Sequence, residues 1–128
     1  MYDDVRAVYE QLIREMEANM PLNTLQMRTC ELFEELGHPT IRQDPLLQKG
    51  YVHGISHGIG LDIHELPSYR GEQAALIPGV IFTVEPGLYY PEDGMGCRLE
   101  DSYYVNENGK IEVLADYPYD LVLPIKEA

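Results

Sequence analysis

Basic residues are scarce in this sequence of 128 residues, in which nine lysines and arginines stand against 22 aspartates and glutamates. The formal net charge is −13. Nucleic-acid phosphates and anionic membrane surfaces attract clustered lysine and arginine side chains, so we expect neither as a partner. We interpret the excess of acids as a solvated surface whose mutual repulsion keeps the protein dissolved.

Cysteines and long apolar runs are also scarce. The two cysteines, Cys30 and Cys97, show no C-x-x-C spacing, which argues against a disulfide framework and a zinc knuckle. The most apolar stretch, residues 74–84, is short and is interrupted by Pro78 and Gly79, and no secretory signal pattern opens the sequence. We therefore expect a soluble, cytoplasmic protein.

The length of the chain and its 45% of hydrophobic residues suit one domain with a core. Residues 1–40 are expected to be its helical part. Apolar residues recur there at spacings of three and four over residues 2–20, which is typical of an amphipathic helix, and Pro21 would end that helix.

A second helix is predicted over residues 23–36. Asn23 can cap its start, with Gln26 three residues later as in a capping box, and Gly37 with Pro39 can stop it. Its buried stripe is predicted to contain Leu25, Thr29, Leu32, Phe33 and Leu36.

The remainder, residues 50–128, is expected to be rich in β-strands because glycine and proline separate short apolar runs. Residues 80–84 are predicted to form a buried strand. Residues 98–105 are predicted to form another, paired in a hairpin with residues 110–114 across a turn at 106–109 that contains Asn-Gly. Two helices followed by antiparallel strands predict an α+β fold, with the helices packed on the sheet.

Three of the four histidines, His53, His57 and His64, fall within twelve residues. Histidine is a frequent metal ligand and transfers protons near neutral pH. Glycines around His57 would let backbone or substrate approach it closely. The alternative is a glycine-rich surface loop with solvated histidines, and the spacing alone does not distinguish the two.

Two glutamates lie next to or within predicted strands. Glu85 follows the strand over 80–84, and Glu100 lies within the apolar segment over 98–105. A carboxylate buried in a strand needs a partner cation. One histidine and two glutamates suit Mn²⁺, Co²⁺, Fe²⁺ or Zn²⁺, with oxygen-rich ligation favouring Mn²⁺. The alternative is that each glutamate faces solvent or pairs with Arg98.

Three blocks of sequence carry a resemblance to a known family. HGIGLDIHE over 57–65, FTVEPGLY over 82–89 and RLED over 98–101 resemble, in this order, the C-terminal signature blocks of the pita-bread metallopeptidases, which include methionine aminopeptidase, aminopeptidase P and prolidase. Within this family, the arginine of RLED makes the sequence more similar to the Xaa-Pro branch, which contains aminopeptidase P and prolidase. The resemblance is specific over residues 51–114, and it implies the second half of the pita-bread (creatinase/aminopeptidase) catalytic domain.

The resemblance also implies a role for each residue of the blocks. His57, Glu85 and Glu100 would be metal ligands, with Glu85 also a general acid/base and Glu100 bridging two metals. The metal most expected is Mn²⁺, with Co²⁺, Zn²⁺ and Fe²⁺ as alternatives.

The remaining site residues would act on the substrate. His64 would bind substrate and stabilise the tetrahedral intermediate, and His53 would contact the substrate near the scissile bond. Arg98 would orient Glu100 or the substrate. The implied reaction is hydrolysis of Xaa-Pro peptide bonds, by a prolidase or an aminopeptidase P.

The family's two remaining metal ligands, aspartates about ten residues apart, are not found before the histidine block. The aspartates in the first half of the sequence lack that spacing: Asp3, Asp4, Asp44 and Asp62. We therefore expect residues 1–128 to be a single, incomplete domain that binds at most one of the two metals and is inactive alone. Its expected partners are a proline-containing peptide, the missing N-terminal half and, through open strand edges, a second copy in a homodimer.

Two alternative functions stay open. One is a non-catalytic protein-binding module of pita-bread type, and the other is a creatinase-like amidinohydrolase. Retention of His57, Glu85 and Glu100 together argues against both.

Overall fold

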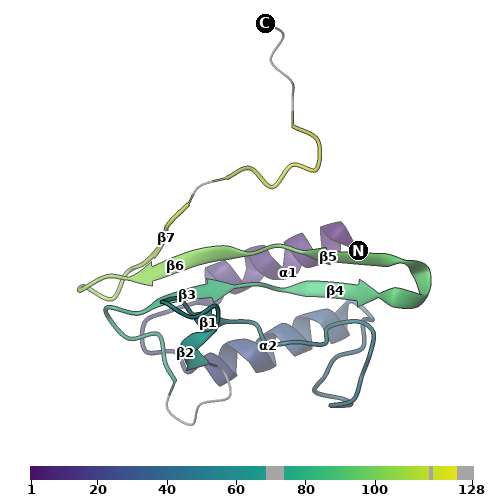
Figure 1. Ribbon diagram of the computed structural model, residues 1–128, viewed down its shortest axis with the longest axis horizontal. Coiled ribbons are helices and arrows are strands. Elements are labelled where there is room, and N and C mark those ends of the chain that lie inside the picture. Colours follow the sequence, from purple (N-terminus) through teal and green to yellow (C-terminus); the bar gives the residue numbers. More distant parts are fainter. Residues whose placement is uncertain (69–73, 116, 124–128) are drawn as a thin grey trace, which may run out of the picture.

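The computed structural model describes residues 1–68, 74–115 and 117–123. Two helices come first, α1 (Tyr2–Glu15) and α2 (Leu22–Glu35), and they lie side by side behind the strands in Figure 1. The strands that follow are β1 (His57–Gly58), β2 (Glu65–Ser68), β3 (Ile81–Val84), β4 (Gly87–Tyr90), β5 (Met95–Arg98), β6 (Asp101–Val105) and β7 (Ile111–Val113). The predicted α+β fold, with two helices packed on an antiparallel sheet, is confirmed.

The described strands form two antiparallel ladders. One sheet has the order β2-β1-β3-β6-β7, and β4 pairs with β5 in a separate two-stranded ladder. Because β3 leads into β4 and β5 leads into β6, the two ladders form one long ribbon with a break at residues 85–86 and 99–100. This break is where the candidate site lies.

The core lies between the helices and the strands. Side chains at spacings of three and four on each helix pack against alternate residues of the sheet, as amphipathic elements require. The core contains these fully or almost fully buried residues, among others: Val5, Val8, Tyr9, Leu12, Leu22, Leu25, Phe33, Tyr51, Ile55, Leu76, Phe82, Val84 and Leu88.

The first helix is shorter than predicted. It ends at Glu15 and not at residue 20, because Met16 has extended backbone angles and Asn19 has φ of 66°. The backbone after it pairs with a distant segment, since Asn19 N–H donates to the Leu76 carbonyl and Leu76 N–H donates to the Met20 carbonyl. Tertiary hydrogen bonding therefore replaces the last predicted helical turn.

The second helix begins at Leu22, so the predicted cap at Asn23 is wrong: Asn23 lies inside the helix, and Pro21 is the capping residue without a side-chain bond. Gln26 does not form a capping box, because its side chain is buried in the protein. Leu36 was predicted in the buried stripe but is 47% exposed, since the helix has ended at that point. Gly37, with φ of 86°, does stop the helix as predicted.

The predicted strand over 98–105 is also wrong in one respect. It is divided, because β5 ends at Arg98 and β6 starts at Asp101. The hairpin with β7 across the turn that contains Gly109 is present as predicted. The β4–β5 hairpin was not predicted. Among the described residues, neither helix is long and apolar enough to cross a membrane.

Candidate metal centre

Glu85 and Glu100 lie at the break between the two ladders. The Glu85 backbone N–H donates to the Ile55 carbonyl at 2.9 Å, which ties this end of β3 to the segment before β1. The Glu85 side chain is 10% exposed, whereas that of Glu100 is 40% exposed. The expected burial of Glu100 within a strand is therefore wrong: the division of the strand places it at the open side of the break.

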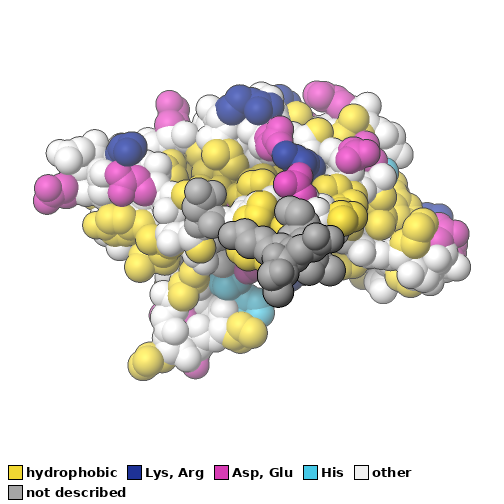
Figure 2. Space-filling model, turned by 90° about the horizontal axis from the view of Figure 1, so that it is seen from above, with side chains coloured by type: hydrophobic (Ala, Val, Ile, Leu, Met, Phe, Trp, Pro, Cys, Tyr) yellow, Lys and Arg dark blue, Asp and Glu magenta, His cyan; other side chains and the backbone are white. Residues whose placement is uncertain are grey.

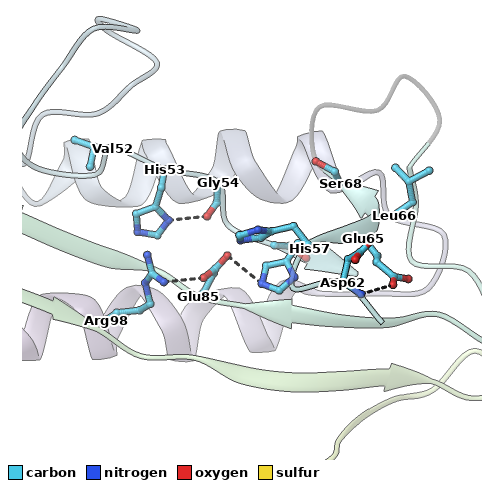
Figure 3. A pocket seen from close by; sticks show the side chains of 12 residues that line it. Val52, His53, Gly54, His57, Asp62, Glu65, Leu66, Ser68, Glu85 and Arg98 are labelled. Atoms are coloured by element: carbon cyan, nitrogen blue, oxygen red, sulfur yellow. Dashed lines mark hydrogen bonds and ion pairs between the residues drawn. The ribbon is translucent and has the colours of Figure 1, made fainter. Parts of the chain in front are cut away.

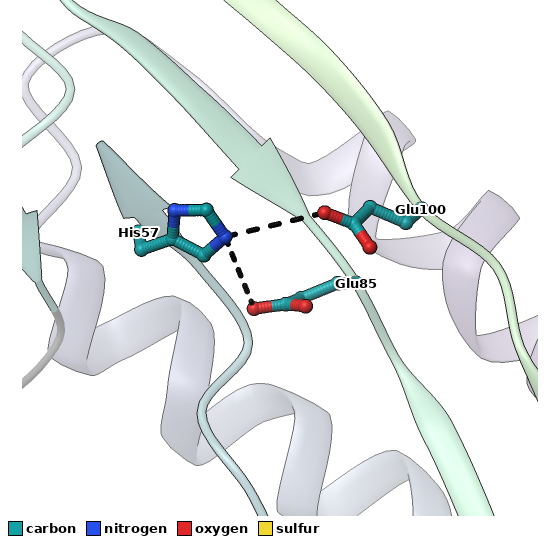
Figure 4. Close-up of side chains that lie close together, drawn as sticks. All are labelled: His57, Glu85 and Glu100. Atoms are coloured by element: carbon teal, nitrogen blue, oxygen red, sulfur yellow. Dashed lines mark ion pairs between the residues drawn. The ribbon is translucent and has the colours of Figure 1, made fainter. Parts of the chain in front are cut away.

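His57 in β1 directs one ring nitrogen at both glutamates. Its Nδ1 lies 2.8 Å from the Gly58 carbonyl oxygen, which can only accept a hydrogen bond, so Nδ1 carries the proton. The lone pair of a neutral His57 is then on Nε2, which lies 3.8 Å from Glu85 Oε1 and 4.0 Å from Glu100 Oε1 (Figure 4). A backbone carbonyl that fixes the tautomer in this way is a common feature of metal-binding histidines.

The donor atoms of these three residues fit one divalent cation. They lie within 4.8 Å of one another, and no other group of three such residues is this close in the described part of the chain. Ligand atoms at about 2.1 Å from a cation are separated by about 3 to 4 Å, depending on geometry. An imidazole nitrogen and two carboxylate oxygens also form a donor set that transition-metal ions accept.

Arg98 supplies the positive charge next to the glutamates. Its Nη1 lies 3.2 Å from Glu85 Oε2 and 4.0 Å from Glu100 Oε2, and its Nε donates to the Tyr89 hydroxyl at 2.8 Å. Burial raises the pKa of Glu85, the nearby Glu100 carboxylate raises it further, and Arg98 acts in the opposite direction. The site therefore gathers more negative charge than one arginine balances.

An open cavity of about 880 Å³ extends from these groups (Figure 3). His53, His57, His64, Glu85 and Arg98 all line it, so the structure brings five of the six predicted site residues to one place. The sixth, Glu100, is not among the lining residues but lies next to His57, as described above.

The two other histidines of the cavity have contrasting surroundings. His64 is exposed, and its ring lies 4.7 Å from the His57 ring. Burial lowers the pKa of His53, and its Nδ1 lies 2.7 Å from the Gly54 carbonyl oxygen. His53 Nε2 is buried without a hydrogen-bond partner among the described residues, which leaves an acceptor for a bound group.

The glycine next to His57 has a structural explanation. A Cβ on Gly58 would lie 2.1 Å from the Leu66 carbonyl oxygen, so the absence of a side chain lets β2 pair with β1. Residues 59–66 carry exposed apolar side chains, and Figure 2 shows histidines at the surface beside a projecting lobe that bears hydrophobic groups. The close approach that the glycines next to His57 predict is made at Gly58 by the backbone of Leu66.

Gln26 and Tyr89 were missed by the sequence reasoning. Tyr89 holds Arg98, and Gln26 bonds to the segment that leads to His57. A signal for Gln26 was present, because it lies four residues after Leu22 and four before Cys30 in the buried face of α2. A polar side chain in such a face needs hydrogen-bond partners.

Comparison with known proteins identifies the family. A family model described as metallopeptidase family M24 matches residues 1–107. The chain belongs to this family. The predicted resemblance to the pita-bread metallopeptidases is thereby confirmed.

Curated relatives and solved structures agree with this assignment. The chain is 29% identical over 110 residues to the Xaa-Pro dipeptidase of Pyrococcus furiosus, covering 85% of this chain and 29% of that protein. It is 34% identical over 91 residues to the Xaa-Pro aminopeptidase of Haemophilus influenzae, covering 64% and 21%. The structure of an Xaa-Pro dipeptidase from Bacillus anthracis superposes with a TM-score of 0.75 at 31% identity, covering 94% of this chain and 31% of that one.

A second structure, an X-Pro aminopeptidase from Thermotoga maritima, gives a TM-score of 0.75 at 28% identity, covering 93% of this chain and 31% of that one. The chain thus spans between 21% and 31% of the length of these four proteins.

Proposed function

We propose that this chain forms the C-terminal part of the catalytic domain of a metal-dependent peptidase that hydrolyses Xaa-Pro bonds. Membership of the M24 family and the names of the relatives support this proposal. The observation that carries it is the cluster of His57 Nε2 with one oxygen each of Glu85 and Glu100. The rest of the catalytic domain would supply the remaining ligands of a two-metal site.

The residues of the cluster would hold one divalent cation. Mn²⁺ is the preferred ion because two of the three donors are carboxylate oxygens, and Co²⁺, Zn²⁺ and Fe²⁺ are the alternatives. When bound, such a cation supplies an activated water at neutral pH and polarises the scissile carbonyl.

The other groups of the cavity would act directly on the substrate. His64, beside His57, would donate a hydrogen bond to the oxyanion that develops on the scissile carbonyl. His53, with its unpaired Nε2, would bind the substrate on the other side of Glu85 (Figure 3). Arg98 would hold Glu85 in place and orient Glu100 or the substrate. A bond before proline lacks the amide N–H, so the site must accept a tertiary amide.

A titration with Mn²⁺, followed by the electron paramagnetic resonance of the free ion, tests the metal site. We expect one ion per chain, and we expect His57→Ala and Glu85→Gln each to abolish binding in the same concentration range. Glu107→Gln, which removes an exposed carboxylate in the β6–β7 turn, is the matched control and should bind like the wild-type chain. Binding that persists in His57→Ala would overturn the proposal. Two tightly held ions per chain would overturn the part of the proposal that says the chain provides only some of the ligands of a two-metal site.

An assay of the isolated, Mn²⁺-loaded chain tests the division of the catalytic domain. We expect no turnover of an Xaa-Pro dipeptide, because the chain provides three donors for a site that works with two metals. Turnover that is lost in Glu85→Gln would show that these 128 residues suffice. The non-catalytic binding module and the creatinase-like amidinohydrolase are disfavoured by the retained donor cluster.

A further inference from the structure

Gln26 is a buried amide whose hydrogen-bonding groups connect α2 to the segment before β1. Its side chain lies in the core face of the helix, and the residue is 4% exposed. Gln26 Oε1 accepts from the Ile55 backbone N–H at 2.7 Å and from the Tyr51 hydroxyl at 3.0 Å. Gln26 Nε2 donates to the His53 carbonyl at 3.3 Å. The amide thus contacts three residues of one short segment, with its acceptor and its donor both in use.

The peptide groups of Ile55 are held from two sides. Its N–H is bonded to Gln26, and its carbonyl accepts from the backbone N–H of Glu85 at 2.9 Å. His57 follows two residues later, and its own N–H donates to Thr83 Oγ1 at 3.1 Å. The position of Gln26 therefore influences where His57 lies relative to Glu85.

The same amide also fixes the surroundings of His53. The His53 carbonyl is bonded to Gln26 Nε2, and the His53 ring packs edge-on against the ring of Tyr51, 5.2 Å away. Tyr51 is itself held through its hydroxyl by Gln26. One side chain outside the cavity therefore orients a histidine that lines it and the segment that carries His57.

We propose that Gln26 is a positioning residue that sets the geometry of the metal ligands and of His53. The proposal rests on the metal site proposed above. Packing of α2 alone does not need an amide here, because an apolar side chain of similar length would fill the same space. A buried amide is tolerated when all its partners are present, and its loss leaves the Ile55 N–H and the His53 carbonyl unsatisfied.

Three variants separate positioning from helix packing. Gln26→Met keeps the length of the side chain and removes every hydrogen bond. Gln26→Glu keeps an acceptor for Ile55 and Tyr51. Thr29→Val is the matched control, since Thr29 is a fully buried polar residue of α2 whose Oγ1 donates within the helix to the Leu25 carbonyl.

The Kd for Mn²⁺ is the main measurement, with hydrogen exchange as the second. We expect Gln26→Met to raise the Kd about threefold to tenfold, which is at or below the roughly tenfold lower limit for groups bonded directly to a metal ligand. The smaller effect is expected because Gln26 bonds to the backbone before His57 and not to a ligand side chain. Gln26→Glu keeps the acceptor for Ile55 and Tyr51 but loses the donor to the His53 carbonyl, so its Kd should lie between those of Gln26→Met and wild type. Thr29→Val should not change the Kd. In the wild-type chain, saturating diamagnetic Zn²⁺ should slow hydrogen exchange at the Ile55 amide by a factor about three or more times larger than at the Thr29 amide. If the position of Gln26 favours metal binding, metal binding must in turn stabilise the hydrogen bonds of Gln26, because such coupling is reciprocal.

The outcomes distinguish the two proposals. A Kd that His57→Ala leaves unchanged overturns the metal site and this inference with it. Binding that His57→Ala abolishes but Gln26→Met leaves within twofold of wild type overturns the role of Gln26 alone, as does an equal loss in Thr29→Val. If Gln26→Met does not fold, exchange in the wild-type chain decides: equal slowing at Ile55 and Thr29 overturns the role of Gln26, and selective slowing at Ile55 supports it.

Discussion

Glu85 and Glu100 lie opposite each other where one strand ladder ends and the next begins. Pairing of β3 with β6 extends to Val84, and pairing of β4 with β5 resumes at Gly87. Neither glutamate therefore belongs to a ladder, and the side chains of both approach Nε2 of His57. A break in a ribbon brings ligands from two chain segments together without requiring a carboxylate inside a continuous strand.

Mn²⁺ should stabilise the folded chain, because the cluster exists only when β1 and the ribbon are assembled. At a free concentration of 100 times the Kd, binding to the folded state alone contributes about 2.7 kcal/mol. We expect thermal unfolding with and without a chelator to show this gain, and Glu100→Gln to lose most of it. Glu92→Gln, at an exposed carboxylate in the β4–β5 connection, should keep it. Equal gains in both variants would contradict a role for Glu100 as a ligand.

Arg98→Met should increase the stabilisation that Mn²⁺ provides. Without metal, the arginine is the cation next to Glu85, so its removal leaves two carboxylates close together and lowers the stability by about 1 kcal/mol or less. Mn²⁺ then relieves a larger repulsion, and its effect on the melting temperature grows. Arg42→Met, which breaks an ion pair with Glu34 in the last turn of α2, should lower the melting temperature and leave the effect of Mn²⁺ unchanged. A smaller effect of Mn²⁺ in Arg98→Met would contradict the prediction.

The sequence predicted the element types well and their ends poorly. Periodicity in residues 2–20 indicates a helix, but it carries no information on the distant backbone of Leu76, which pairs with the end of that stretch. The same limit applies to Glu100. The segment over 98–105 is typical of one strand in the sequence, and only the pairing partners on each side divide it between β5 and β6.

The candidate site was predicted through its motifs and not through its geometry. Histidine and glutamate types made these residues candidates, since such donors are unusual in apolar surroundings, and the resemblance of the three sequence blocks to a known family selected them. The supporting contacts of Gln26 were not predictable from spacing. Its partners lie 25 to 29 residues further along the chain, and only the packed helix brings them into reach.

Leu61→Lys together with Leu66→Lys should reduce self-association. Leu61, in the loop before β2, is 104% exposed, and Leu66, in β2 beside the cavity, is 82% exposed. Exposed apolar patches promote association, and lysine adds charge that opposes it. Sedimentation velocity over a range of concentrations measures the change. Leu46→Lys, at a leucine that is 80% exposed in another loop, is the control and should associate like the wild-type chain. A wild-type chain that is monomeric at high concentration would contradict the predicted self-association.

Glu15 and Arg28 join the end of α1 to α2, and their pair should make stability depend on pH. Arg28 Nε and Nη2 donate to the two Glu15 carboxylate oxygens at 2.8 and 3.0 Å. These bonds lower the pKa of Glu15 below its ordinary value of 4.5. A carboxyl whose pKa is lower in the folded state stabilises the fold above the unfolded pKa, and the contribution is lost as the pH falls through the folded value. We therefore expect Glu15→Gln to be less stable than wild type by about 1 kcal/mol or less at pH 7, as is usual for a half-exposed pair. The difference should shrink as the pH falls below 4.5.

Urea unfolding at a series of pH values measures this difference in the free energy of unfolding. Glu17→Gln serves as the control, because Glu17 is exposed and forms no ion pair with another described residue, and this variant should be about as stable as wild type at pH 7. A difference for Glu15→Gln that persists unchanged at pH 3 would show that packing, and not the charged pair, joins the two helices at this point.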